Sequence, residues 1–166
     1  MIKKIKNTIK KIDQFFYKKF GSDKSIKPLE NIKEVQIIFS HLNKKGEESK
    51  VRFVGGCIRK VLCGEVVDDI DLATSFEPNE VKSKLIKENI KVIDTGISHG
   101  TVTAILNKTK FEITTLRKDI STDGRHANVE FTMNWNDDAS RRDFTINAIY
   151  ADIEGRIFDP LNGILD

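Results

Sequence analysis

A glycine turn followed by two alternating acids constrains this chain more than any other feature of the sequence. The apolar run from Val51 to Val54 predicts a buried strand that ends at Gly55 and Gly56. Thirteen residues after Gly56, Asp69 and Asp71 lie two apart in a second apolar run. Side chains two apart on a strand share one face, so the two carboxylates should project together.

Two carboxylates on one strand face can hold a pair of hard cations, which lie about 4 Å apart in two-metal sites. One ion would lower the pKa of an attacking hydroxyl, and the other would neutralise a triphosphate. The helix expected from Cys57 to Leu62 begins at the glycine turn, where backbone N–H groups can approach phosphate oxygens. A turn or an acidic strand end alone more often has a structural role. Their order and spacing here favour metal-dependent nucleotidyl transfer.

Two later segments carry further candidate residues. Glu112 stands between two apolar residues of a later expected strand and could bring a third carboxylate to the same pocket. Arg141, Arg142 and Asp143 form a dense polar cluster. The planar guanidinium groups of arginines bind phosphate oxygens well. Asp143 could accept a hydrogen bond from a ribose hydroxyl or orient an arginine. The alternative is an ion-pair cluster on a helix surface.

Longer stretches resemble class II CCA-adding enzymes and bacterial poly(A) polymerases. The most specific is RRDFTINA at 141–148; VGGCIR at 54–59 resembles their glycine-turn motif, and DIDLAT at 69–74 their metal-binding strand. Other similar segments follow in the family's order: His99–Val102, Glu112–Arg117, Asp123–His126, and Asp159-Pro160 with Gly163 and Asp166. The resemblance covers residues 51–166.

The resemblance implies an α/β fold, a small mixed twisted sheet with helices packed on one side, as in polymerase-β-like nucleotidyltransferase head domains. It implies transfer of AMP or CMP from ATP or CTP to the 3′-hydroxyl of tRNA or another RNA. Asp69 and Asp71 would bind two Mg²⁺ ions, with Glu112 as a third ligand or positioning acid. The implied nucleotide-binding residues are Gly55, Gly56, Arg59, His99, Arg141, Arg142, Asp143 and Asn147.

The sequence departs from the family pattern at two points. Lys60 stands where the family usually has an acid, which would either reduce activity or only change a salt bridge. The family continues into a neck, whose Glu-Asp-x-x-Arg motif selects the base, and into helical domains that hold tRNA, whereas this sequence stops at Asp166. Residues 137–141 imitate that motif, and we interpret this as coincidence. Two alternatives to a catalytic head therefore stay open: a nucleotide-binding module that needs a separately encoded neck and body, and a non-catalytic remnant.

Composition narrows the class of protein only a little. The chain has 166 residues and a net charge of +3, which suit one mildly basic domain and permit a phosphate-bearing partner. Cys57 and Cys63 lack partner histidines, which favours reduced thiols in a cytoplasmic protein over a zinc site or disulfides. No apolar run approaches a membrane span, and no secretory signal is visible.

We expect two parts: a basic helical extension over residues 1–50 and a head domain over 51–166. Residues 1–20 carry one apolar stripe flanked by lysines. This pattern predicts a packing helix with a solvated face, a helix that contacts RNA or a membrane surface, or a mitochondrial transit peptide. A linker should follow over residues 21–28.

Periodicity and turn residues predict the remaining elements. Asp68 has the wrong strand parity for the metal pair and should face solvent, and His41 should be a surface residue. Arg117–Asn128 looks like a mobile loop. The expected helices are 29–42, 78–89 and 142–150, and the expected strands are 91–94, 101–106, 110–116 and 157–158.

Overall fold

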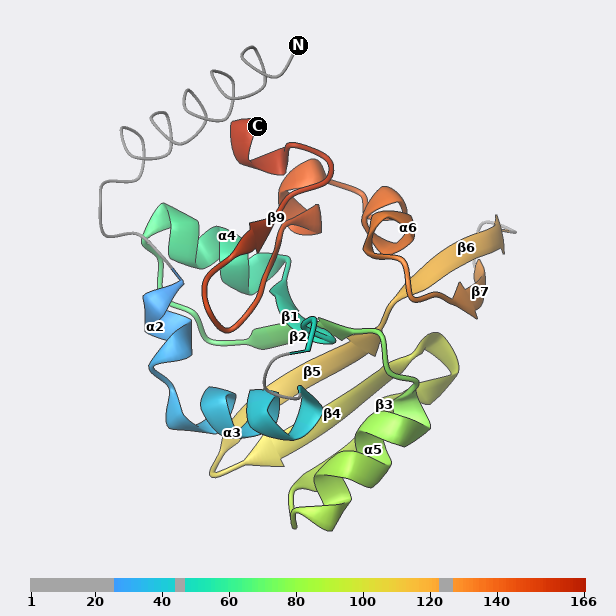
Figure 1. Ribbon diagram of the computed structural model, residues 1–166. Coiled ribbons are helices and arrows are strands. Elements are labelled where there is room, and N and C mark those ends of the chain that lie inside the picture. Colours follow the sequence, from blue (N-terminus) through green and yellow to red (C-terminus); the bar gives the residue numbers. More distant parts are fainter. Residues whose placement is uncertain (1–25, 44–46, 123–126) are drawn as a thin grey trace.

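The computed structural model describes residues 26–43, 47–122 and 127–166 (Figure 1). The basic helix expected over residues 1–20 and most of the expected linker lie outside these ranges. A mixed sheet of seven strands has the order β3-β4-β5-β2-β1-β8-β9. Its pairs are antiparallel except β2 with β5. The strands of this sheet are β1 (Val51–Val54), β2 (Ile70–Thr74), β3 (Lys91–Gly96), β4 (Thr101–Leu106), β5 (Thr109–Thr115), β8 (Tyr150–Ala151) and β9 (Ile157–Phe158).

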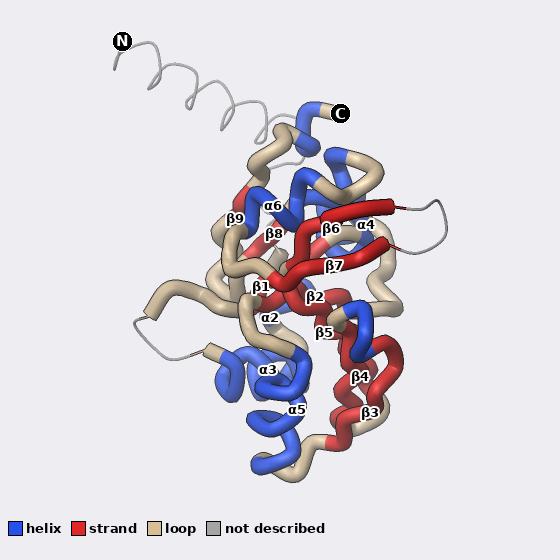
Figure 2. Tube along the Cα trace, turned by 90° about the vertical axis from the view of Figure 1, so that its right-hand side faces the viewer, coloured by secondary structure: helices blue, strands red, loops and turns tan. Residues whose placement is uncertain are grey.

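Four helices contribute to one large core against the sheet. They are α2 (Lys27–Glu30), α3 (Lys33–Leu42), α4 (Gly56–Cys63) and α5 (Pro78–Lys87). Figure 2 shows α3 and α5 on one side of β4 and β5. Buried residues of α3, including Ile38 and Phe39, share this core with Leu72 and Ile113 of the central strands. The predicted α/β fold is confirmed, with these four helices on one side of the sheet. Helices α2 and α3 belong to the same core as the strands.

The opposite face of the sheet carries polar residues at its centre. Strand pairing aligns Asp71 of β2 with Glu112 of β5, Glu112 with Thr103 of β4, and Thr103 with Ile93 of β3. Their sequence neighbours Leu72, Ile113 and Val102 are buried in the core. This alternation separates an apolar face under the helices from a polar face that carries the acids.

A second, smaller cluster of apolar residues lies at the other end of the polar face. It is formed around α6 (Trp135–Ser140), the 3₁₀ turn η2 (Thr145–Ala148) and β8. The buried members are Val54, Ala73, Leu116, Ala139, Ala148 and Tyr150. Because β8 pairs with β1 through Val54 and Tyr150, this cluster holds residues 135–151 against the strand that precedes the glycine turn.

Most of the expected elements are confirmed, with small shifts at their ends. The sequence predicts the positions of four elements correctly: the strand β1, the helices α4 and α5, and the β4–β5 hairpin. The helix expected over residues 29–42 is divided into α2 and α3, with Asn31 and Ile32 between them. None of the helices in the described ranges is long and apolar enough to cross a membrane.

The prediction of a mobile loop over residues 117–128 is wrong for residues 117–122 and 127–128, whereas residues 123–126 lie outside the described ranges. Residues 117–122 form β6 (Arg117–Thr122), which pairs antiparallel with β7 (Ala127–Phe131) in a separate two-stranded sheet. Ile120 is 61% exposed, and Lys118 pairs with Glu130 at 3.1 Å. In β7 the apolar residues Ala127, Val129 and Phe131 alternate with polar ones, but β6 has Ile120 as its one apolar residue. With no alternation in β6, sequence periodicity did not reveal the hairpin.

The prediction of a helix over residues 142–150 is also wrong. The helix comes earlier, as α6, and the side chain of Asn134 caps it by accepting a hydrogen bond from the backbone N–H of Asn136 at 3.0 Å. After it the chain forms only η2 and then enters β8. Pairing of β8 with β1 supplies backbone hydrogen bonds that compete with a helix at this point, and local sequence does not report that partner.

Candidate active site

Three carboxylates line one pocket on the polar face of the sheet. Asp71 lies directly opposite Glu112 because β2 and β5 are parallel neighbours in this register. The pocket has a volume of about 520 Å³. Its lining residues are Asp69, Ile70, Asp71, Ile93, Thr95, Thr103, Ile105, Lys110 and Glu112. The structure therefore brings together the three acids that the sequence singles out.

The charges of this pocket repel one another. Burial raises the pKa of Asp71, and the neighbouring charges of Glu112 and Asp69 raise it further. Arg142 and Lys60 act in the opposite direction without reversing the shift. A half-buried carboxylate among like charges gains most from a bound cation, so the electrostatics fit a cation site.

The donor set fits magnesium that is shared with a substrate. Within the described residues, no group of three histidine, cysteine or acidic side chains could hold a metal ion by itself. Mg²⁺ commonly takes only one or two protein carboxylates and completes its shell with water and phosphate oxygens. Asp69 and Asp71 are oxygen donors of this kind, and Glu112 lies beside them in the same pocket.

The glycine turn lies between the carboxylates and the arginine cluster. Gly55 has a φ of +66°, which only glycine adopts at little cost. A Cβ atom added at Gly56 would lie 3.8 Å from Oδ2 of Asp71, and one added at Gly55 would lie 3.9 Å from Nη1 of Arg142. The turn thus keeps side-chain atoms out of the space between Asp71 and Arg142, where α4 begins.

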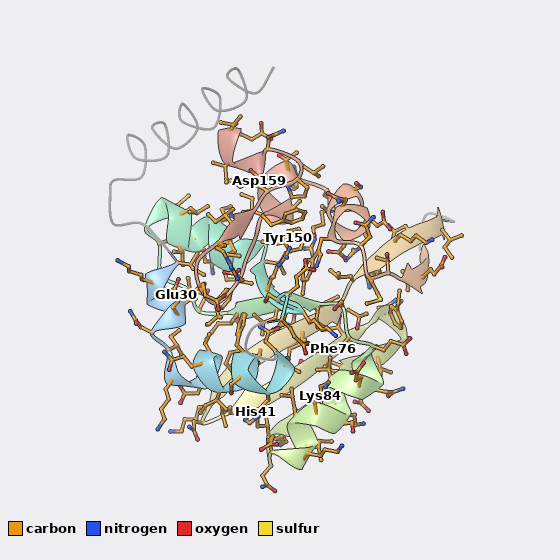
Figure 3. All side chains as sticks on the ribbon, in the orientation of Figure 1. Glu30, His41, Phe76, Lys84, Tyr150 and Asp159 are labelled. Carbon is orange, nitrogen blue, oxygen red and sulfur yellow. The ribbon has the colours of Figure 1, made fainter. Side chains whose placement is uncertain are left out.

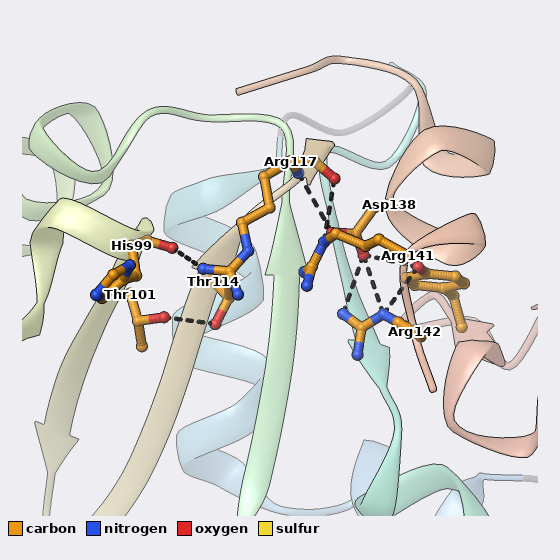
Figure 4. Close-up of polar contacts among 8 residues, drawn as sticks. His99, Thr101, Thr114, Arg117, Asp138, Arg141 and Arg142 are labelled. Atoms are coloured by element: carbon orange, nitrogen blue, oxygen red, sulfur yellow. Dashed lines mark hydrogen bonds and ion pairs between the residues drawn. The ribbon is translucent and has the colours of Figure 1, made fainter. Parts of the chain in front are cut away.

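Asp138 organises the arginine cluster, and sequence reasoning missed it. This carboxylate is 1% exposed. One oxygen accepts hydrogen bonds from Nε and Nη2 of Arg141 at 3.0 and 2.7 Å. The other accepts from Nε and Nη2 of Arg142 at 3.1 and 3.0 Å and from the hydroxyl of Tyr150 at 2.7 Å (Figure 4). The imitation of a neck motif by residues 137–141 therefore has a structural role in this chain.

The two arginines more than balance the charge of Asp138, so the cluster keeps an excess of positive charge. Burial alone would raise the pKa of Asp138, but the guanidinium groups of Arg142 and Arg141 outweigh it and lower that pKa below its ordinary value. Burial raises the pKa of Tyr150, which stays protonated as the donor. A signal for Asp138 did exist in the sequence, since an acid three and four residues before two arginines forms ion pairs on a helix.

The remaining candidates fall into two groups. Arg59 on α4 donates a hydrogen bond from its guanidinium to the side-chain oxygen of Asn147, so these two predicted nucleotide-binding residues hold each other. Asp143 and His99 are exposed. Asp143 makes no hydrogen bond to the rest of the described chain through its side chain, which leaves its carboxylate open to a ligand.

The departure at Lys60 is compensated locally. Its ammonium group pairs with Asp68, whose side chain is 69% exposed, as expected from its strand parity. The hydrogen bond between them raises the pKa of Lys60 and lowers that of Asp68.

His41 lies on α3 at the helical side of the sheet, whereas Tyr150 lies beside the C-terminal elements (Figure 3).

Known proteins resemble both the sequence and this arrangement. The family model for the poly A polymerase head domain matches residues 51–166. The human protein named CCA tRNA nucleotidyltransferase 1, mitochondrial, is 46% identical over 121 residues, which are 72% of this chain and 28% of that protein.

Solved structures show the same likeness. The Bacillus stearothermophilus CCA-adding enzyme in complex with CTP has a TM-score of 0.66 and 37% identity, covering 78% of this chain and 30% of that one. A tRNA nucleotidyltransferase complexed with a primer tRNA and an incoming ATP analogue has a TM-score of 0.54 and 27% identity, covering 70% and 32%. The chain thus spans less than a third of the length of these proteins.

Proposed function

Because the chain belongs to the poly A polymerase head-domain family, we propose that it is the catalytic head of an RNA nucleotidyltransferase. It would transfer AMP or CMP from ATP or CTP to the 3′-hydroxyl of an RNA and release pyrophosphate. The observation that carries this proposal is the pocket in which Asp69, Asp71 and Glu112 meet beside the glycine turn.

The residues divide the work by their chemistry. Asp69 and Asp71 would hold two Mg²⁺ ions, with Glu112 positioning them or acting as a further ligand. Bound Mg²⁺ lowers the pKa of an attacking hydroxyl and neutralises phosphate charge. Gly55 and Gly56 leave room for phosphate oxygens at the start of α4.

The polar residues around this pocket would bind the rest of the nucleotide. Arg142, held by Asp138, supplies positive charge beside the glycine turn. Asp143 would accept a hydrogen bond from the ribose, and Arg59, Asn147, Arg141 and His99 would complete the nucleotide site.

The partners follow from the same proposal. A tRNA 3′ end is the preferred acceptor, since a relative was solved with a primer tRNA. Residues 51–166 would act as the head and residues 1–50 as a basic extension, of which α2 and α3 pack into the core of the head. Neck and body domains, on the same polypeptide or separately encoded, would supply base selection and most of the contacts with RNA. We also place the protein in the cytoplasm, in keeping with its two free thiols, Cys57 and Cys63.

Substitution of the metal-binding acids tests the function. Asp69→Ala and Asp71→Ala should each reduce Mg²⁺-dependent incorporation of labelled AMP or CMP into tRNA about a thousandfold, since several kcal/mol of transition-state stabilisation is lost. Asp68→Ala removes the same charge from an adjacent residue and should leave incorporation nearly unchanged. Equal incorporation by Asp71→Ala and the parent would refute the metal assignment.

A melting experiment without catalysis gives a second readout. Asp71→Asn removes a charge that burial and two neighbouring acids disfavour, so the metal-free variant should melt at a higher temperature than the parent at pH 7. Mg²⁺ with ATP should raise the melting temperature of the parent and not that of the variant. An equal rise for both proteins would show that the ligand binds elsewhere.

A further inference from the structure

A third arginine, Arg117, lies next to the arginine cluster, but its side chain does not pair with the carboxylate of Asp138. The backbone N–H of Arg117 donates to Oδ1 of Asp138 at 3.3 Å, and its carbonyl accepts from Nε of Arg141 at 3.1 Å. Its side chain instead extends toward η1 (Ile97–His99), where Nη1 donates to the carbonyl oxygen of His99 (Figure 4). The backbone of Arg117 therefore belongs to the cluster, while its guanidinium points elsewhere.

The guanidinium of Arg117 is incompletely satisfied. Its Nε is buried and has no hydrogen-bond partner. No ion pair joins Arg117 to an acid of the described residues, whereas Arg141 and Arg142 both pair with Asp138. Burial lowers the pKa of Arg117, and the positive charge of Arg141 lowers it further. A cation that is partly removed from water and not paired carries an electrostatic cost that a bound anion would offset.

Arg52 shows how the same protein satisfies another half-buried arginine. Its Nη1 also has no hydrogen-bond partner, but its guanidinium stacks over Trp135 at 4.2 Å and over Phe158 at 5.1 Å. Glu48 lies 3.6 Å from its Nη2. Arg52 thus contacts two aromatic rings and an acid. In the described part of the chain Arg117 makes neither kind of contact, and the charges of Asp119 and Asp138 raise its pKa only from beyond ion-pair distance.

The surroundings of Arg117 suit a phosphate group. Arg117 follows β5, the strand that carries Glu112 and Thr114 on the polar face. The hydroxyls of Thr114 and Thr101 lie 3.0 Å apart, and the side chain of Arg117 lies between them and the Asp138 cluster (Figure 4). Arginine, hydroxyl donors and excess positive charge on one rim are the groups that bind phosphate oxygens.

We propose that Arg117 is a phosphate-binding residue at the rim of the candidate active site, with the hydroxyls of Thr101 and Thr114 beside it and Arg141 adding positive charge. The phosphate belongs either to the incoming nucleotide or to the RNA strand, so this inference rests on the proposed function. Arg117 was not among the residues that sequence reasoning selected.

Binding measurements on the full 166-residue chain test the site. Arg117→Gln removes the charge, and Arg117→Lys keeps it without the planar fork. Lys118→Gln is the matched control, because it removes one positive charge from the next residue, which is paired with Glu130 on the hairpin surface. The probes are ATP with Mg²⁺, inorganic pyrophosphate, and tRNA without its CCA end at two salt concentrations.

Arg117→Gln should weaken at least one probe about tenfold, as expected for one charge-assisted hydrogen bond. Arg117→Lys should have an intermediate affinity, and Lys118→Gln should stay within about twofold of the parent. Loss of ATP and pyrophosphate binding would assign the phosphate to the nucleotide. Loss of tRNA binding with a shallower salt dependence would assign it to the RNA.

Two results would overturn the site: unchanged affinity of Arg117→Gln and Arg117→Lys for all three probes, or an equal loss in Lys118→Gln. If the parent incorporates nucleotides and Arg117→Gln binds normally, the site is wrong and the function stands. If pyrophosphate binding depends on Arg117 but the parent incorporates nothing with any RNA, the site stands and the function fails.

Discussion

The carboxylate of Asp138 is almost fully buried, yet it accepts hydrogen bonds from the side chains of Arg141, Arg142 and Tyr150. This single residue sets the direction of both arginines that begin the family's most specific motif. It also explains why Arg142 reaches the glycine turn in a defined position, since both oxygen atoms of the carboxylate are occupied. Asp138 is a positioning residue, and it acts on the candidate site through the arginines.

Replacement of Asp138 should therefore be costly. Asp138→Asn leaves two partly buried guanidinium groups without their counter-charge and should reduce the free energy of unfolding by about 3 kcal/mol. Urea denaturation at pH 7 measures this difference. Asp143→Asn makes the same charge change at an exposed neighbour and should have little effect on stability. Equal stability of Asp138→Asn and the parent would contradict the role of Asp138 in holding Arg141 and Arg142, which we call the Asp138 clamp.

The pH dependence of this difference has a definite sign. Asp138 has a lowered pKa in the folded protein, so its stabilisation is complete above the ordinary value of 3.8 and disappears as the pH falls through the folded value. The stability gap between the parent and Asp138→Asn should therefore be constant near neutrality and shrink below about pH 4. A gap that grows on acidification would contradict this assignment.

At the scale of elements, the C-terminal turn η3 (Gly163–Leu165) packs closely on η2. Both oxygens of Asp159 accept backbone N–H groups, from Gly163 at 2.8 Å and from Ile164 at 3.0 Å. A Cβ atom added at Gly163 would lie 2.1 Å from the carbonyl oxygen of Thr145. Only a glycine allows this approach, because a backbone atom cannot move aside as a flexible side chain can.

Gly163→Ala should destabilise the protein by about 2 kcal/mol or more, because η2 and η3 must separate. A thermal melt should show a decrease of roughly 4–8 °C for a chain of this length. Gly96→Ala is the control, since its Cβ would lie 3.7 Å from the Cβ of Thr101, an ordinary contact. An unchanged melting temperature for Gly163→Ala would show that the contact between η2 and η3 is loose.

At the scale of the whole molecule, the groups around the candidate pocket recognise features common to all nucleotides. Carboxylates, arginines and a glycine turn act on metal ions, phosphates and ribose, none of which differs between bases. Discrimination between bases needs donors and acceptors matched to a base edge, so that a wrong base leaves buried polar groups unpaired.

The 166-residue chain should therefore bind ATP and CTP with similar affinity and hold tRNA weakly, with an affinity that falls steeply with salt. Competition among all four nucleoside triphosphates and tRNA titrations at two salt concentrations measure both properties. A tenfold preference for one base, about 1.4 kcal/mol, would show that the head carries its own selector. Tight, salt-insensitive tRNA binding would contradict the need for further domains.

The sequence by itself determined the central part of the sheet and the acids on it. Asp69 and Asp71 alternate with Ile70 and Leu72, and this period of two assigns them to opposite faces of a strand whatever its neighbours are. The glycine turn before α4 was also predicted from the sequence, because two adjacent glycines can adopt backbone conformations that other residues cannot. Gly55 does adopt a positive φ. Local physical rules suffice for features of this kind.

Tertiary structure decided the features that depend on a partner distant in sequence. Parallel pairing of β2 with β5 decided that Glu112 would face Asp71, and pairing with β1 made residues 150–151 a strand where the sequence favoured a helix. The clamp at Asp138 needs Tyr150, twelve residues away, and the open guanidinium of Arg117 is recognised only once its neighbours are known. The burial of a charged group and the absence of a partner for it are properties of the packed chain, and no local pattern of residues reports them.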